Sequence, residues 1–159
     1  MSNAPPPRPR VVAGKRRFVI VSSKFNARYV QGLVDHALDE FRKQSPDADL
    51  TCYRVPGAFE IPVVVQDIAA NKRADAILGV GVILKGHTEH AENLARSITD
   101  ALQRIALEHG VPVIHCVLSL DSEEQARERC LKESINRGRE AARAAIEMAN
   151  VMADLHAKP

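Results

Sequence analysis

A run of ten residues at positions 81–90, GVILKGHTEH, carries the side chains with the clearest chemical potential in the chain. Its apolar first half is typical of a strand, and its second half, with Gly86 and Thr88, leads toward a helix. Backbone N–H groups and the dipole at a helix start favour an anion, and Lys85 adds positive charge. His90 falls in the expected first turn, where a histidine can exchange protons near neutral pH. The run therefore indicates either an anion site beside a general acid or base, or a surface histidine at an ordinary helix start.

Two further loops combine aromatic and polar residues. Phe25 follows a short apolar run, where it either stacks on a flat heterocycle or packs against the next helix. In residues 55–62, VPGAFEIP, Gly57 permits close approach of the backbone and the coming helix offers free N–H groups. Glu60 either accepts hydrogen bonds from a polyol or only stabilises the helix start. The local sequence leaves both pairs of alternatives open.

The remaining candidates are basic residues near the end of the chain and a pair of histidines. Arg129 and Arg137 flank a short loop, where each either binds phosphate as a fork or lies on the surface. His115 falls inside an expected strand. His87 and His90 are three residues apart, but no carboxylate or cysteine convincingly completes a ligand set with them, so we expect no metal site.

Alternating strand and helix patterns position these residues. Apolar and β-branched runs predict strands at 18–21, 50–55, 76–84 and 111–118, and apolar spacings of three and four predict helices at 27–44, 59–71, 89–109, 121–130 and from 136 onward. Asp121 and Glu124 have capping-box spacing for the short helix. The alternation predicts an α/β fold, a flavodoxin-like three-layer α/β/α sandwich with a four-stranded parallel sheet. Ligands of such sheets bind beyond the carboxyl ends of the strands, so the loops described above should meet there.

Charge divides the chain into two parts. Residues 1–17 hold five basic and no acidic side chains, and the remainder holds 17 basic and 20 acidic ones, within a net charge of +2. An acidic body is a poor match for nucleic-acid binding. Four prolines among residues 5–9 would interrupt a strand, so we expect a Pro-rich basic arm at 1–16 and a single domain at 17–156. No apolar run approaches the ~20 residues of a membrane helix, and three widely spaced cysteines indicate reduced thiols in the cytoplasm.

Several stretches, taken together and in order, resemble the 6,7-dimethyl-8-ribityllumazine synthase family of riboflavin biosynthesis. The resemblance covers about residues 17–155. Any one stretch is a weak signal, and their common order and spacing make a strong one. The matching stretches are KFN at 24–26, VPGAFEIP at 55–62, the G-x-T-x-H core of 81–90, DSEEQA at 121–126 with Arg129, NRG at 136–138 and AIEMAN at 145–150.

The resemblance implies a transferase that condenses 5-amino-6-(D-ribitylamino)uracil with 3,4-dihydroxy-2-butanone 4-phosphate, releasing phosphate and water without a metal or organic cofactor. It implies a general acid/base role for His90 and stacking of Phe25 on the pyrimidine, with Asn26 also in the substrate site. It further assigns the ribityl chain to Ala58, Phe59 and Glu60, the ring pocket to Val82, Ile83 and Leu84, the phosphate to His87, Thr88 and Arg129, and substrate contacts to His115, from a neighbouring subunit, and Arg137.

Five positions depart from the family pattern, among them His87, which is an unusual choice beside the phosphate. Glu89 replaces the usual proline before the catalytic histidine, and Ala91 replaces the usual phenylalanine after it. His115 stands where phenylalanine is common, and Arg137 where lysine is usual. These changes bear on affinity and rate more than on the type of reaction.

The family resemblance also implies self-association, with sites between subunits of a pentamer or of a 60-subunit shell. The prolines of the arm favour the pentamer slightly, although the short loop from 129 to 136 favours the shell. The implied partners are the two small substrates, other copies of the chain and riboflavin synthase, without nucleic acid or membrane. The alternatives are a catalytically weak flavin- or lumazine-binding relative, an archaeal-type riboflavin synthase, and a phosphate-binding flavodoxin-like domain.

Overall fold

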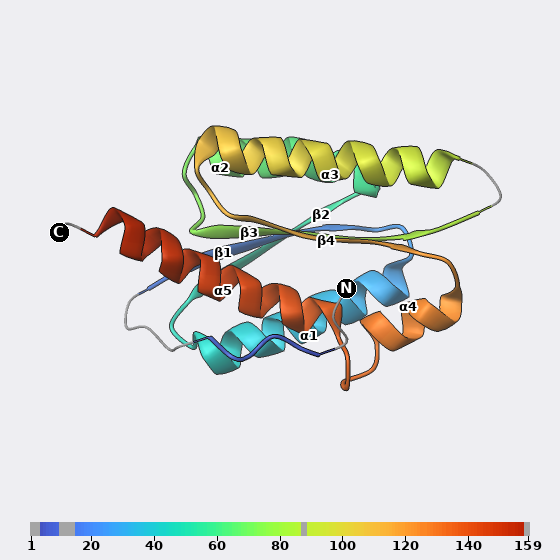
Figure 1. The fold of residues 1–159 in the computed structure, drawn as a ribbon, viewed down its shortest axis with the longest axis horizontal. Helices are drawn as coiled ribbons and strands as arrows, with labels where there is room; N and C mark the ends of the chain where they lie inside the picture. The colour runs from blue at the N-terminus through green and yellow to red at the C-terminus, as the bar shows by residue number, and fades with distance from the viewer. Residues whose placement is uncertain (1–3, 10–14, 87–88, 158–159) are drawn as a thin grey trace.

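The computed structural model describes residues 4–9, 15–86 and 89–157. Within these residues, four strands form one parallel sheet in the order β2-β1-β3-β4 (Figure 1). The expected four-stranded parallel sheet is therefore confirmed. The strands are β1 (Arg17–Ser23), β2 (Asp49–Val55), β3 (Ala76–Leu84) and β4 (Val113–Leu120).

Helices cover both faces of the sheet and complete the three layers (Figure 1). One face packs against α1 (Ala27–Gln44), α4 (Glu123–Cys130) and α5 (Arg137–His156). The other packs against α2 (Ile61–Ala70) and α3 (His90–His109), with a short 3₁₀ turn, η1 (Ala58–Glu60), before α2. Among the helices of the described residues, none combines the length and apolarity needed to cross a membrane.

Strand β3 is the centre of the molecule. All but its last residue are buried, and it pairs with β1 on one side and β4 on the other. Its side chains alternate between two cores, because successive residues of a strand point to opposite faces. Leu78 and Val80 join the core beneath α1 and α5, and Ile77 and Ile83 join the core beneath α2 and α3.

The expected short helix begins two residues later than its sequence pattern indicates. Ser122 is its N-cap, with its hydroxyl accepting a 3.2 Å hydrogen bond from the N–H of Gln125. The prediction that Asp121 and Glu124 form a capping box is therefore wrong. Asp121 instead pairs with Lys85 at 3.0 Å, because the preceding strand runs to Leu120 and carries Asp121 toward the neighbouring loop.

Residues 4–9 of the N-terminal arm run along α1 and α5 (Figure 1). Arg143 of α5 holds the arm by donating a 2.9 Å hydrogen bond to the carbonyl of Pro6. The same guanidinium lies 2.8 Å from the carboxylate of Glu40, which is 1% exposed. Arg8 of the arm also faces Glu40, at 3.6 Å. A buried carboxylate requires such partners, since an unpaired buried charge is costly.

Helices α1 and α5 approach closely at Gly138. A Cβ at this position would collide with the backbone carbonyl of Leu33. Asn136 caps the start of α5, accepting hydrogen bonds from the N–H groups of Gly138 at 2.9 Å and Arg139 at 3.2 Å. The absence of a side chain at Gly138 therefore sets the spacing of the two helices.

The substitution Gly138→Ala tests this contact. Because the obstructing atoms belong to the backbone, one helix must shift, and we expect a loss of about 1–3 kcal/mol in the free energy of unfolding. Urea denaturation measures it. Gly86→Ala is the matched control, since a Cβ at Gly86 meets nothing within 4 Å. Equal stability of the two variants would contradict the prediction.

Candidate active site

A cavity of about 540 Å³ opens at the carboxyl ends of the strands. Three loops that are distant in the sequence meet there, as the parallel topology requires. Nine of the residues assigned to the site from the sequence line this cavity, and Gly57 and Leu94 complete the lining. The nine are Phe25, Asn26, Ala58, Phe59, Glu60, Val82, Ile83, Leu84 and His90.

The first loop is held by its backbone and by one amide side chain. Asn26 adopts a left-handed conformation, with φ 54°, and precedes α1. Its Nδ2 donates a 2.7 Å hydrogen bond to the carbonyl of Val82. The N–H of Lys24 donates to the carbonyl of Val55 at 2.9 Å. These bonds connect the loop after β1 to the ends of both β3 and β2.

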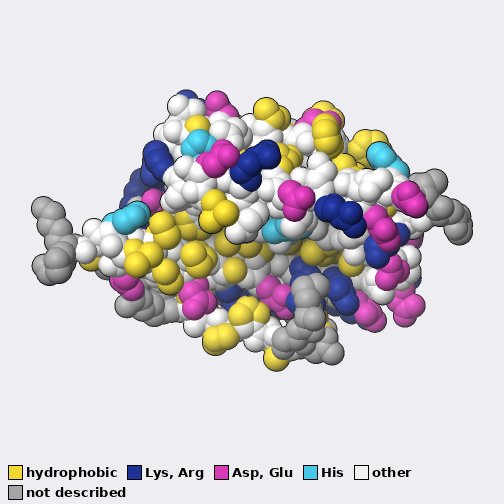
Figure 2. Space-filling model, turned by 45° about the horizontal axis from the view of Figure 1, so that its top comes forward, with side chains coloured by type: hydrophobic (Ala, Val, Ile, Leu, Met, Phe, Trp, Pro, Cys, Tyr) yellow, Lys and Arg dark blue, Asp and Glu magenta, His cyan; other side chains and the backbone are white. Residues whose placement is uncertain are grey.

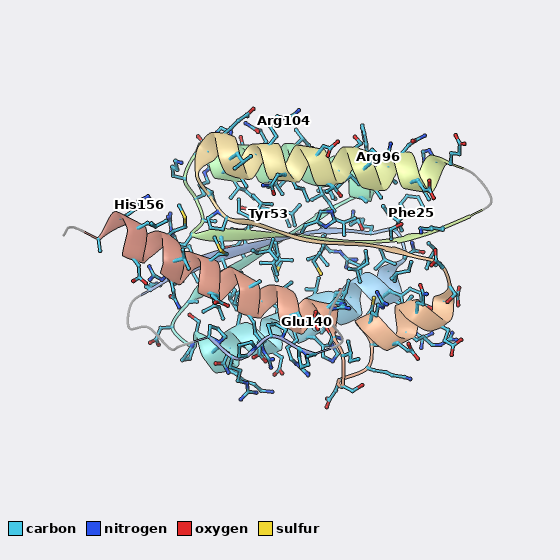
Figure 3. The ribbon with its side chains drawn as sticks, viewed as in Figure 1. Phe25, Tyr53, Arg96, Arg104, Glu140 and His156 are labelled. Atoms are coloured by element: carbon cyan, nitrogen blue, oxygen red, sulfur yellow. The ribbon has the colours of Figure 1, made fainter. Side chains whose placement is uncertain are left out.

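Phe25 does not pack into the core. Its side chain is 72% exposed, and Figure 3 shows it at the end of the sheet where β3 leads toward α3. Burial against the next helix, the alternative that the sequence left open, is therefore excluded. The ring borders the cavity, where it presents an aromatic surface to a ligand.

Glu60 caps the second loop and also reaches the cavity. Its Oε2 accepts a 2.8 Å hydrogen bond from the N–H of Gly57. A carboxylate has roughly four acceptor positions, so this bond leaves capacity for ligand hydroxyls. The capping role and the binding role of Glu60 are compatible.

His90 is the first residue of α3 and is exposed at the rim of the cavity. Lys85, in the loop between β3 and α3, forms an ion pair with Asp121 across the gap to the loop after β4. The hydrogen bond between them lowers the pKa of the Asp121 carboxyl and raises the pKa of the Lys85 ammonium. His87 and Thr88 lie outside the described residues.

Three of the predicted residues lie away from this cavity. Arg129 is a half-buried residue of α4, on the opposite face of the sheet from α3. His115 and Arg137 border a second cavity of about 280 Å³ between β4 and α5, together with Glu140. Figure 3 shows Glu140 on α5, on the other side of the sheet from α3. In a single chain, the predicted site is therefore divided.

The second cavity holds a tight ion pair and a fixed histidine. Arg137 Nη1 lies 2.6 Å from Glu140 Oε2, and their side chains are 13% and 16% exposed. Nε of Arg137 is buried and has no hydrogen-bond partner among the described residues. Nε2 of His115 lies 2.7 Å from the hydroxyl of Thr99 on α3.

Comparison with known proteins decides the family. The family model described as 6,7-dimethyl-8-ribityllumazine synthase matches residues 15–153. A curated protein named 6,7-dimethyl-8-ribityllumazine synthase, from Halorhodospira halophila, is 39% identical over 142 residues, covering 89% of this chain and 91% of its own length. The chain belongs to the 6,7-dimethyl-8-ribityllumazine synthase family. It is thus an enzyme of the transferase type, with a role in riboflavin biosynthesis.

Two solved structures of a GDP-L-fucose synthetase from Naegleria fowleri have a more distant likeness. The chain bound to NADP is 13% identical with a TM-score of 0.42, and the other chain is 14% identical with a TM-score of 0.39. The alignment with the NADP-bound structure covers 98% of this chain and 47% of that chain. The alignment with the other structure covers 97% of this chain and 48% of that chain. This lumazine synthase family member therefore spans about half the length of each.

Two polar residues of this lumazine synthase family member that contact predicted site residues were not predicted from the sequence. They are Glu140, which pairs with Arg137, and Thr99, which contacts His115. Glu140 follows Arg137 by three residues on one helix, and this spacing is itself a signal for an ion pair. Thr99 has no comparable signal, because it meets His115 only through the packing of α3 on β4.

Asn26 provides a test of how the first loop is held. Alanine is strained in the left-handed region by about 1–2 kcal/mol, whereas glycine is not. We therefore expect Asn26→Ala to lower the free energy of unfolding more than Asn26→Gly. Chemical denaturation of the two variants measures the difference.

Asn71 offers the matched control. It also donates its Nδ2 to a backbone carbonyl, that of Asp67 at 2.8 Å, but its φ is −93°. Alanine at Asn71 should therefore cost no more than glycine. The same order of stabilities at both positions would contradict the strain assigned to Asn26.

Proposed function

We propose that the chain condenses 5-amino-6-(D-ribitylamino)uracil with 3,4-dihydroxy-2-butanone 4-phosphate to form 6,7-dimethyl-8-ribityllumazine, releasing phosphate and water. The observation that carries this proposal is the convergence of an aromatic ring, a carboxylate and an imidazole on one cavity at the carboxyl edge of the sheet. Membership of the lumazine synthase family supports it.

Each wall of the cavity suits one part of the pyrimidine substrate. Phe25 stacks on the flat ring, since offset aromatic contact is favourable. Glu60 accepts hydrogen bonds from the ribityl hydroxyls, beside Ala58 and Phe59. Val82, Ile83 and Leu84, at the end of β3, line the ring pocket with backbone groups. Asn26 supports this wall through its hydrogen bond to Val82.

The reaction needs a held pair of substrates and a group that moves protons. The amine attacks the ketone, water leaves to give an imine, phosphate is eliminated, and the second nitrogen attacks the remaining carbonyl and closes the ring with loss of a second water. His90, at the rim of the cavity, exchanges the protons of these steps. The N–H groups at the start of α3 favour the phosphate, with His87 and Thr88 assigned to it by resemblance.

The divided arrangement of the predicted residues supports a site shared by two subunits. We assign the second half, His115, Arg137 and Arg129, to a neighbouring copy of the chain. Exposed apolar residues of α5, including Met148, Val151 and Leu155, suit self-association. Figure 2 shows hydrophobic side chains gathered between α3 and α5. The arm supports a pentamer over a shell, since Arg143 binds it to α5 and its prolines disfavour strand addition.

The assay of purified protein with the two substrates tests the reaction. Product forms with the absorbance and fluorescence of a lumazine. A rate no greater than the uncatalysed background would overturn the proposal and favour a flavin- or lumazine-binding relative. That alternative is considered because Glu89 and Ala91, the neighbours of His90, differ from the residues usual in the family.

The variant His90→Ala tests the proton-transfer role. Since a positioned acid or base contributes about 10²–10⁴-fold, we expect kcat to fall by up to that factor while remaining above the uncatalysed rate. Steady-state kinetics measure it. His156→Ala, at the far end of α5 in Figure 3, is the control and should leave kcat unchanged. An unchanged kcat in His90→Ala would remove the assigned role.

Mixed oligomers test the shared site. Oligomers made only of His90→Ala subunits, or only of Arg137→Ala subunits, should have low activity. Co-expression of the two variants should restore part of the activity. In random assembly about one quarter of the interfaces join an intact His90 of one subunit to an intact Arg137 of its neighbour. Light scattering of the same preparations should report a five-subunit particle. Failure of the mixture to exceed either parent would show that each subunit carries its own complete site.

A further inference from the structure

His115 uses both of its ring nitrogens within the chain. Nε2 lies 2.7 Å from the hydroxyl of Thr99, and Nδ1 accepts a 3.2 Å hydrogen bond from the N–H of Val117. The second bond provides an acceptor for the N–H of Val117, which lies on β4 at an edge of the sheet. Among the described strands β4 pairs with β3 alone, and its N–H groups that point away from β3 need partners outside the sheet.

The directions of these bonds define the protonation state of the ring. The single hydroxyl hydrogen of Thr99 is donated to the carbonyl of Ala95 at 2.8 Å. The hydroxyl must therefore accept from His115, so Nε2 carries a hydrogen. Nδ1 accepts from Val117 and cannot carry one. Only the neutral Nε2–H tautomer satisfies all three contacts.

A protonated ring would be at odds with this arrangement. A hydrogen on Nδ1 would face the N–H of Val117, placing two donors against each other. His115 remains partly exposed at the strand edge, and partial desolvation of its ring by the surrounding groups lowers its pKa. The charged side chains of the adjoining cavity, Arg137 and Glu140, are paired with each other. His115 is therefore held as an uncharged aromatic ring whose polar edge is already engaged.

We propose that Thr99 is a positioning residue that fixes His115 as the neutral Nε2–H tautomer, so that the ring offers its flat face to a planar heterocycle. The ligand part of this inference rests on the proposed function, in which His115 faces the pyrimidine bound by a neighbouring subunit. Offset stacking uses the face of a ring, and the in-plane hydrogen bonds of Nε2 and Nδ1 leave the face of His115 available for it while fixing its plane. His115 thus serves as a wall of the site and takes no part in proton transfer.

Nitrogen-15 spectroscopy of the whole protein tests the tautomer. Magic-angle-spinning NMR of the histidine-labelled chain distinguishes Nε2–H, Nδ1–H and charged rings, and the difference spectrum against His115→Phe identifies His115. We expect the Nε2–H form at neutral pH. Thr99→Val should add the other tautomer or the charged form, and Thr99→Ser should restore the original signal. A charged or Nδ1–H ring in the unaltered protein would overturn the proposal.

Thr51→Val is the matched control, because Thr51 lies on β2, at the opposite edge of the sheet. The substitution is the same, and the His115 signal should not change. If Thr51→Val altered the signal as much as Thr99→Val does, the effect would be general and the proposal would fail.

Kinetics separate positioning from a structural effect. Thr99→Val should raise KM for the pyrimidine substrate by about 2- to 10-fold, the range that one hydrogen bond supports, with kcat nearly unchanged. In the His115→Phe background, Thr99→Val should change nothing further, because the ring no longer needs orientation. An equal rise in KM in both backgrounds would contradict the role of Thr99. Absence of product in the unaltered protein, with the Nε2–H signal retained, would overturn the proposed function while supporting the Thr99–His115 contact.

Discussion

The parallel pairing of β3 with β1 and β4 is the constraint on which the site depends. Because all strands run the same way, their carboxyl ends lie at one edge, and the loops after them share one region. The burial of β3 on both faces makes this edge rigid. Asn26 then connects the loop after β1 directly to the end of β3 through Val82. The aromatic ring of Phe25 and the imidazole of His90 are brought together by this framework.

The same sheet also separates the predicted residues. His90 follows β3 and begins a helix on one face, whereas Arg137 begins a helix on the other. His115 lies on β4, at the edge of the sheet, which is open to another molecule. In a single chain, the predicted site residues thus border two separate cavities. This separation is the observation on which the proposal of a site shared between copies rests.

Two charged side chains with little exposure to solvent, those of Glu40 and Arg137, are each balanced by an adjacent side chain of opposite charge. The buried carboxylate of Glu40 is matched by Arg143, and through it the N-terminal arm is joined to the body. Arg137 is matched by Glu140 at the second cavity. At both positions the charge is balanced by a specific neighbouring side chain, so the net charge of the chain says little about where a charged ligand would bind.

The alternation of apolar runs was sufficient to predict the sheet, its helices and the edge where the candidate site lies, because periodicity is a local property of the chain. The residues of the first cavity could also be predicted from the sequence, since Phe25, Glu60 and His90 each follow a strand that the apolar pattern identifies. The tertiary structure alone decided that Phe25 is exposed, that Ser122 and not Asp121 caps α4, and that His115 and Arg137 border a separate cavity. It also decided the state of the His115 ring, because Thr99 is on another element and meets it only through the packing of α3 against β4. Such contacts depend on register and side-chain direction between distant segments, which no local pattern encodes.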